Sequence, residues 1–221
     1  MAKNDGSVRV WDWPVRVSHW GFALLVPAMW YTAEYSHWVW HKRLGLVLLG
    51  LLVFRFLCGC FGTRTARFAS FVKGPGAVLA YLRGHRESGV GHTPVGALSV
   101  VALLLAMSVQ VGMGLFAGDP YDGATGPLNS LVGIGTADWL TDTHEWFYWV
   151  VLGLVALHLA AIAFYTFVRR KKLVGPMITG KCQSDAEQGN DPEAWATSLA
   201  GMAMAVGVSI WVAYGAPPFG G

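Results

Sequence analysis

Long apolar stretches with few charged positions recur along the whole chain. A transmembrane helix needs about 20 predominantly apolar residues to cross a hydrocarbon core of about 30 Å. Five stretches approach or exceed this length, and each is expected to form a membrane-spanning helix. The predicted spans run approximately from Val17 to Ala33, Val39 to Phe61, Thr93 to Gly118, Trp146 to Val168 and Ala194 to Tyr214. The pattern therefore predicts an all-α integral membrane protein.

The composition supports this prediction and excludes several other classes of protein. Only 13% of the 221 residues are charged, against about 25% in a typical soluble domain, and the mean hydropathy is +0.44. The low charge argues against a disordered chain. The net charge of +3 is too small and too dispersed for a nucleic-acid binder. Three cysteines without a Cys-x-x-Cys motif exclude a disulfide framework and covalent attachment of a c-type haem.

The distribution of Lys and Arg predicts the orientation in the membrane. Thirteen of these residues lie before the first span or in the connections after the second and fourth spans, whereas only Lys42 and Arg43 lie in a connection on the other side. The third connection, from Asp119 to Glu145, has five carboxylates and no Lys or Arg. The positive-inside rule then predicts a cytoplasmic N-terminus and an external C-terminus. Trp and Tyr gather near the predicted helix ends, as is typical of interface anchors.

Two histidines of the fourth predicted span are spaced so that they share one helix face. Fourteen residues separate His144 from His158, which is just under four helical turns and about 21 Å along the helix axis. Ionisable residues inside a membrane are costly and usually face the interior of a helix bundle. One helix is therefore expected to offer an imidazole near each membrane surface.

Each of these histidines has a possible partner at the same depth on another span. His19 begins the first span, level with His158, and His41 begins the second span, level with His144. A b-type haem iron needs two axial nitrogens from opposite sides of the porphyrin, so two such pairs predict two haem sites. Zinc and copper sites collect three or four ligands around one ion, and the separation of the histidines disfavours them.

Other residues are weaker candidates. Arg55 follows His41 by fourteen residues and should lie at the depth of the inner haem, where a propionate could pair with its guanidinium. Gly45 could let a flat ring approach the backbone, and a packing role explains this glycine equally well. His37 is a rival to His41 as a ligand. His85 and His92 lie in the basic second connection and are expected to be surface or capping residues.

Together these motifs resemble the bacterial di-haem membrane cytochromes b of the cytochrome b561 class, which include the b-type subunits of nickel-iron hydrogenases. The matching segments are VWDWPVRVSHW (10–20), HKRLG (41–45), GHTPVGAL (91–98), GPL (126–128), His144-Glu145 with His158, and MITG (177–180). The resemblance implies axial ligation of two haems b by His19, His41, His144 and His158. Arg16 and Arg55 occupy motif positions without being ligands.

The resemblance also implies a domain organisation and a function. Residues 1–180 would form a four-helix di-haem transmembrane domain, and residues 181–221 a polar linker with a fifth, C-terminal transmembrane helix. Such proteins carry electrons in the bacterial inner membrane between a periplasmic partner, such as a c-type cytochrome or an oxidoreductase, and the quinone pool. The chain could act as a homo-oligomer or as a subunit of a larger complex in the lipid membrane.

Two alternative functions remain open at this point. Some relatives suggest an enzyme, a superoxide:quinone oxidoreductase that works at the outer haem. A haem-free transporter or metal permease would instead use the histidines to line a path. An optical spectrum separates the cytochrome from the transporter, and superoxide-driven haem reduction identifies the enzyme.

Overall fold

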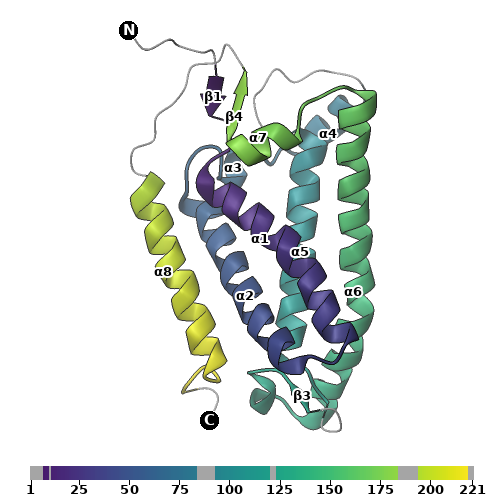
Figure 1. Cartoon of the computed structure of the whole chain (residues 1–221), viewed down its shortest axis with the longest axis vertical. Helices are drawn as coiled ribbons and strands as arrows, with labels where there is room; N and C mark the ends of the chain where they lie inside the picture. The colour runs from purple at the N-terminus through teal and green to yellow at the C-terminus, as the bar shows by residue number, and fades with distance from the viewer. Residues whose placement is uncertain (1–6, 10, 84–92, 120–122, 184–193, 219–221) are drawn as a thin grey trace.

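Long helices packed side by side form the body of the protein (Figure 1). The computed structural model describes the chain except residues 1–6, 10, 84–92, 120–122, 184–193 and 219–221. The helices are α1 (Trp13–Glu34), α2 (Trp38–Phe61), α3 (Phe68–Phe71), α4 (Pro75–Leu82), α5 (Pro94–Phe116), α6 (Ile134–Ala163), α7 (Val174–Thr179) and α8 (Ala194–Ala213). A 3-10 turn, η1 (Asn129–Leu131), precedes α6, and a π-helical turn, η2 (Phe164–Val168), continues it. The short strands are β1 (Ser7–Arg9), β2 (Gly118–Asp119), β3 (Ala124–Thr125) and β4 (Lys181–Gln183).

Four of the described helices are long and apolar enough to cross a membrane, namely α2, α5, α6 with η2, and α8 from Trp195. The predicted second, third, fourth and C-terminal spans are therefore present as helices of suitable length and composition. The predicted first span corresponds to α1, a helix of 22 residues. It is not among the four, because polar residues such as Arg16, Ser18 and His19 occupy its first turns.

The fourth predicted span begins earlier than expected. The apolar stretch starts near Trp146, but α6 begins at Ile134. Helical hydrogen bonding does not depend on apolar side chains, so the helix continues into the polar segment beyond the apolar stretch. Asp138, Asp142 and Glu145 therefore lie on a helix rather than in a loop. Asp122, which belongs to the same acidic connection, lies outside the described residues.

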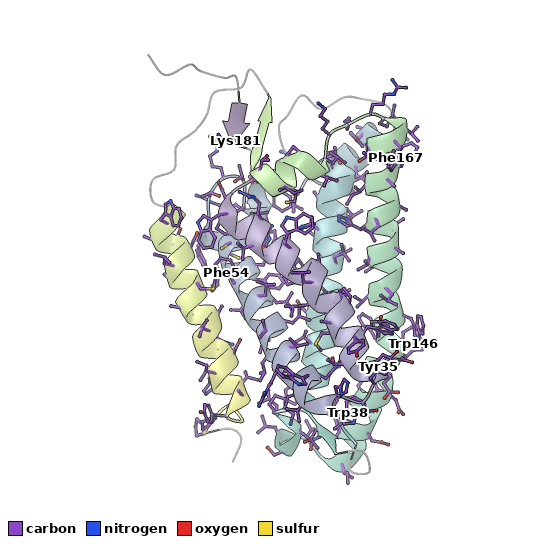
Figure 2. The ribbon with its side chains drawn as sticks, in the orientation of Figure 1. Tyr35, Trp38, Phe54, Trp146, Phe167 and Lys181 are labelled. Atoms are coloured by element: carbon purple, nitrogen blue, oxygen red, sulfur yellow. The ribbon has the colours of Figure 1, made fainter. Side chains whose placement is uncertain are left out.

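The helices pack in a fixed order. Helix α1 packs on α2, α2 on α5, and α5 on α6, whereas α8 packs on another side of α2 (Figure 1). The largest core cluster joins α2, α5 and α6, and includes Leu52, Met107 and Val151. Phe54 of α2 is 1% exposed and fills the core on the side that faces α8 (Figure 2). The packing leaves α8 outside the group formed by α1, α2, α5 and α6.

The two ends of the bundle differ. At one end, here called the α7 end, β1 pairs antiparallel with β4, and α7, which follows α6 along the chain, lies beside the start of α1 (Figure 1). The backbone N–H of Trp11 donates to the Gly180 carbonyl at 3.2 Å, the indole N–H of Trp20 donates to the Met177 carbonyl at 3.3 Å, and Arg16 donates to the Ile178 carbonyl. These contacts join the segments 10–20 and 177–180, which are the first and the last of the motifs quoted from the sequence.

The opposite end, here called the β2–β3 end, is closed by a short turn. The backbone N–H of Gly126 donates to the Ala117 carbonyl at 2.8 Å, and that of Leu128 donates to the Leu115 carbonyl at 2.9 Å. A Cβ at position 126 would come within 2.3 Å of the Leu115 carbonyl oxygen, so only glycine allows this approach. The GPL motif therefore forms a tight turn that folds back on the last residues of α5, beside the start of α6.

Candidate functional site

The structure brings His19 and His158 together at the α7 end. The two rings have centroids 6.4 Å apart and planes inclined by 57°. His19 lies in the second turn of α1, and His158 lies near the end of α6. Residues from opposite parts of the chain thus meet because α1 and α6 both reach this end of the bundle.

His41 and His144 form a second pair at the β2–β3 end. Their ring centroids are 6.2 Å apart, and the planes are nearly perpendicular at 85°. His41 lies in the first turn of α2, and His144 lies in the first half of α6. The observed pairs are those that equal depth predicts, and the crossed pairs do not form.

The spacing within each pair suits one metal ion held between two imidazoles. A metal–imidazole bond is about 2.0–2.1 Å long, and the ring centre lies about 1.1 Å beyond the nitrogen, so two opposed imidazoles have centroids about 6.2 Å apart. The observed 6.2 and 6.4 Å fall at this value. Each pair can therefore supply the two axial nitrogens of a haem iron.

Hydrogen bonds orient His41 for such a role. Its Nδ1 lies 3.1 Å from the Met29 carbonyl oxygen and 3.2 Å from the Thr32 hydroxyl. Since a carbonyl can only accept, Nδ1 carries the hydrogen and Nε2 keeps its lone pair for a metal. A partner of this kind on the other ring nitrogen is typical of metal-ligating histidines.

The histidines of α6 are oriented in the same way by α5. His144 Nδ1 donates to the Gln110 carbonyl at 2.9 Å, and the Gln110 side-chain amide donates in return to the His144 carbonyl at 3.0 Å. His158 Nδ1 lies 3.3 Å from the Ser99 hydroxyl. Sequence reasoning did not identify Thr32, Ser99 or Gln110, although a polar residue inside an apolar span is the signal that could have found them.

Unpartnered buried atoms gather around the two pairs. Among the described residues, His19 Nδ1, Arg16 Nε and Gln110 Oε1 are buried and have no hydrogen-bond partner. A buried polar atom without a partner costs about 1–3 kcal/mol, so a polar group from outside the chain would stabilise these positions. Arg16 Nε and His19 Nδ1 can donate to a carboxylate such as a haem propionate, whereas the amide oxygen of Gln110 accepts and needs a donor; the imidazole pairs and the two unpartnered donors fit a haem.

A glycine that the sequence analysis did not single out lies against His144. A Cβ built on Gly114 would come within 2.8 Å of the imidazole Cε1. The predicted glycine, Gly45, has more room, because its Cβ would meet only Met29 Cε, at the ordinary contact distance of 3.6 Å. Packing within the chain therefore requires glycine at 114 and does not require it at 45.

Arg55 is buried, as expected for a functional arginine in an apolar helix. Its side chain is 4% exposed, Nη1 donates to the Ala66 carbonyl at 3.2 Å, and the guanidinium lies 5.0 Å from the Phe68 ring centroid. Among the described residues, no carboxylate forms an ion pair with it. Leu51, one turn earlier on α2, packs on Gly21 of α1, which places Arg55 level with the turns of α1 that carry His19.

The remaining histidines do not join either pair. The ring of His37 lies 6.0 Å from that of Tyr31, at the beginning of α2. His85 and His92 lie outside the described residues. In the part of the chain that the structure describes, no group of three or more His, Cys, Asp or Glu side chains could hold a metal ion. Four of the described histidines thus form two separate pairs, and neither pair belongs to a larger cluster of metal-binding side chains among the described residues.

Comparison with known proteins agrees with this geometry. A family model described as prokaryotic cytochrome b561 matches residues 10–180, which contain all four paired histidines and both ends of the motif set. No curated protein and no solved structure matches the chain significantly. Since the match covers well over half of the sequence, the chain belongs to the prokaryotic cytochrome b561 family.

Proposed function

We propose that this protein carries single electrons across the bacterial membrane through two b-type haems, one held by His19 and His158 and one by His41 and His144. Family membership supports transmembrane electron transfer with b-type haem. The observation that carries the proposal of two sites is the presence of two imidazole pairs, with centroid separations of 6.4 and 6.2 Å, at opposite ends of one bundle.

A bound haem would supply the one-electron redox chemistry, and the chain would supply its ligands and surroundings. The paired imidazoles would hold the iron, and the hydrogen bonds from Nδ1 of His41 and of His144 to backbone carbonyls keep these two rings neutral and strengthen them as ligands. Two imidazoles per iron suit electron transfer rather than oxygen binding. Leu52, Met107 and Val151 of the apolar core separate the two ends and exclude water between them.

We further propose that the α7 end faces the cytoplasm and the β2–β3 end the periplasm. The helix ends and loops at the α7 end carry most of the described Lys and Arg residues, including the run from Arg169 to Lys172. The β2–β3 end carries Lys42 and Arg43 together with exposed carboxylates on α6. The positive-inside rule favours this orientation.

The electron partners follow from this orientation. A membrane quinone is the proposed partner in the lipid, and a periplasmic protein such as a c-type cytochrome is the proposed partner in water. Exposed Asp138, Asp142 and Glu145 favour a basic protein at the outer end. The same carboxylates repel superoxide anion, so the superoxide:quinone oxidoreductase activity is the less favoured alternative. Exposed apolar residues of α8, such as Leu199 and Ile210, leave room for a second copy or another subunit.

The proposal is tested on protein purified from membranes in detergent. Haem extraction and a pyridine haemochrome spectrum should give two haems b per chain, and a redox titration should show two one-electron steps. A quinol analogue should reduce both haems under anaerobic conditions. A preparation that contains the folded protein without haem contradicts the proposal and favours the transporter, and rapid haem reduction by superoxide favours the enzyme.

A further inference from the structure

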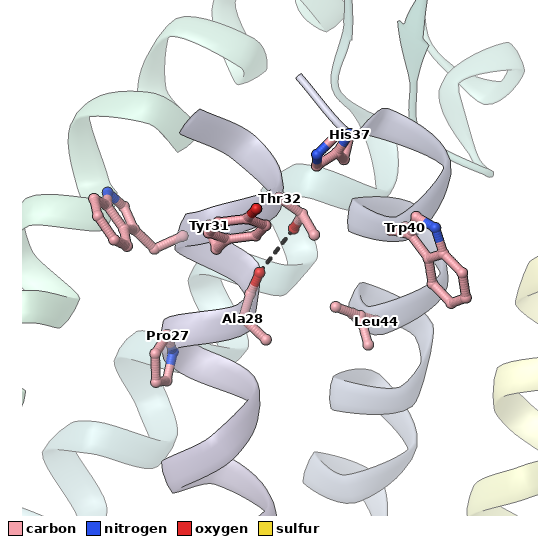
Figure 3. A pocket seen from close by; sticks show the side chains of 8 residues that line it. Pro27, Ala28, Tyr31, Thr32, His37, Trp40 and Leu44 are labelled. Carbon is pink, nitrogen blue, oxygen red and sulfur yellow. Dashed lines mark hydrogen bonds between the residues drawn. The ribbon is translucent and has the colours of Figure 1, made fainter. Parts of the chain in front are cut away.

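A pocket of about 790 Å³ lies between the end of α1 and the start of α2, close to the β2–β3 end (Figure 3). Its volume lies within the usual range of about 300–1,000 Å³ for small-molecule sites. Residues of both helices and of the connection between them line it, among them Pro27, Tyr31, Thr32, His37, Trp40 and Leu44. None of the four paired histidines is among the residues that line this pocket, so it is a separate feature.

The lining combines flat aromatic surfaces with a few polar groups. The indole of Trp40 and the phenol of Tyr31 are more than half exposed, at 57% and 52%. The imidazole of His37 lies 6.0 Å from the Tyr31 ring, so two groups that can donate a hydrogen bond lie at the same part of the pocket (Figure 3). Pro27 and Leu44 lie further from the helix ends and provide an apolar continuation toward the middle of the membrane (Figure 3).

One buried side chain joins this pocket to the outer histidine pair. Thr32 is 6% exposed, lines the pocket, and places its hydroxyl 3.2 Å from Nδ1 of His41. The same hydroxyl donates to the Ala28 carbonyl at 2.9 Å (Figure 3). A molecule in the pocket would therefore lie one side chain away from a proposed haem ligand.

We infer that this pocket binds the head group of a membrane quinone. The inference rests on the proposed function and assigns a place to its lipid-soluble partner. A quinone has a flat ring that suits Tyr31 and Trp40, oxygens that suit the donors of Tyr31 and His37, and an apolar tail that can follow Pro27 and Leu44 into the lipid. A phospholipid is the competing occupant: the lining residues include no Lys or Arg, but the Arg43 guanidinium lies 5.3 Å from the ring centroid of Trp40 and can pair with a lipid phosphate, so the experiment must distinguish the two.

Photolabelling of the purified, haem-containing protein tests this site. The probe is an azido-benzoquinone with a short isoprenoid tail, and mass spectrometry locates the adducts after illumination. Adducts are expected within residues 27–44. An excess of unlabelled quinone should remove them, and an equal excess of phosphatidylethanolamine should not. Adducts located mainly elsewhere, or removed by the phospholipid alone, overturn the inference.

Variants with matched controls sharpen the test. Leu44→Trp fills the pocket and should lower labelling at least tenfold, whereas Val39→Trp, at an exposed position of the same helix that does not line the pocket, should label like the native protein. Tyr31→Phe removes one hydrogen-bond donor and should weaken quinone binding about 3- to 10-fold. Tyr214→Phe, at an exposed position directly after the end of α8, should not change it. Unchanged labelling in Leu44→Trp contradicts the assignment.

The same preparation separates failure of this site from failure of the proposed function. If the quinol reduces both haems while the adducts lie elsewhere, the pocket is wrongly assigned and the electron-transfer function stands. If the protein holds no haem, the proposed function fails wherever the adducts lie. Labelling inside 27–44 that Leu44→Trp abolishes supports the site independently of any turnover measurement.

Discussion

Gly114 of α5 lies directly against the imidazole of His144 on α6. A Cβ at position 114 would come within 2.8 Å of Cε1 and 3.2 Å of Nδ1 of that ring, and real Cβ atoms do not approach other atoms so closely. The ring is fixed from a second side by the Gln110 carbonyl, one turn earlier on the same helix. The α5 backbone therefore determines where the His144 ring can lie.

This relationship predicts that Gly114→Ala damages the outer haem site. The added methyl must displace the imidazole, and overpacking of this kind costs about 1–3 kcal/mol. We expect the haem content to fall from two per chain toward one, with the inner haem retained. Pyridine haemochrome analysis together with a redox titration measures both effects.

Gly112→Ala is the matched control for this change. It lies two residues earlier on α5, and a Cβ there would meet nothing within 4 Å. Its haem content and potentials should equal those of the native protein. Equal haem loss in both variants would show that any alanine in this part of α5 is harmful, and that the contact with the His144 ring is not the cause.

The pairing of the histidines predicts selective loss of single haems. His158→Ala should remove the inner haem and keep the outer one, and His144→Ala should do the reverse, because each residue belongs to a different pair. His37→Ala should keep both haems, since its ring faces Tyr31 rather than a pair. Redox titration and haem quantification distinguish the two haems. Loss of the outer haem alone in His158→Ala would refute the assigned pairs.

The hydrogen bond between Thr32 and His41 predicts a tuned potential at the outer haem. Thr32→Val keeps the shape of the side chain and removes its hydroxyl. Without this hydrogen bond the His41 imidazole donates electron density to the iron less strongly, so the ferric state of the outer haem is less stabilised. A neutral hydrogen bond contributes about 1 kcal/mol, and about 1.4 kcal/mol corresponds to 59 mV for one electron. We expect the midpoint potential to rise by about 20–50 mV.

Thr32→Ser provides the control for that substitution. It retains a hydroxyl at the same position and should keep the native potential within the error of a spectroelectrochemical titration. The inner haem, at the other end of the bundle, should be unaffected in both variants. A potential that shifts equally in Thr32→Ser and Thr32→Val would point to altered packing around His41 rather than to the hydrogen bond.

The burial of Arg55 predicts an electrostatic effect on the inner haem. Coulomb's law gives about 1.7 kcal/mol, or about 70 mV for one electron, for two unit charges about 10 Å apart at an effective dielectric constant of about 20, and a positive charge at Arg55 would favour the reduced state of a nearby haem by that order. Arg55→Leu should lower the inner midpoint potential by that order, and Arg55→Lys, which keeps the charge, should lower it less. A loss of thermal stability with unchanged potentials would show that Arg55 only anchors the loop at Ala66.

The arrangement of the four paired histidines was predictable because helix length and membrane thickness together restrict depth. Once His144 and His158 share one helix, each can reach only partners at its own end of the bundle, and the structure shows that result. The spans from Val39 and Thr93 begin within one residue of α2 and α5. At these two positions the apolar stretch and the helix begin at nearly the same residue, so hydropathy locates the start of the helix.

The contacts that orient these histidines were not predictable from the sequence. Gly114 meets His144 only because of how α5 and α6 are rotated about their axes, and no spacing along one helix specifies that rotation. The early start of α6 at Ile134 was missed because hydropathy reports on the membrane and not on the helix. The pocket at Tyr31 and His37 likewise depends on the angle between α1 and α2.

The division of each histidine pair between distant parts of the chain bears on how the protein is made. The hairpin of α1 and α2 carries one ligand for each site, and α6 carries the other two. Neither site exists until α6 has entered the membrane beside the first helices. If each pair holds a haem, haem insertion must follow synthesis of almost the whole family domain, and strand β4, which is made after α6, can pair with β1 only after all four histidines have been synthesised.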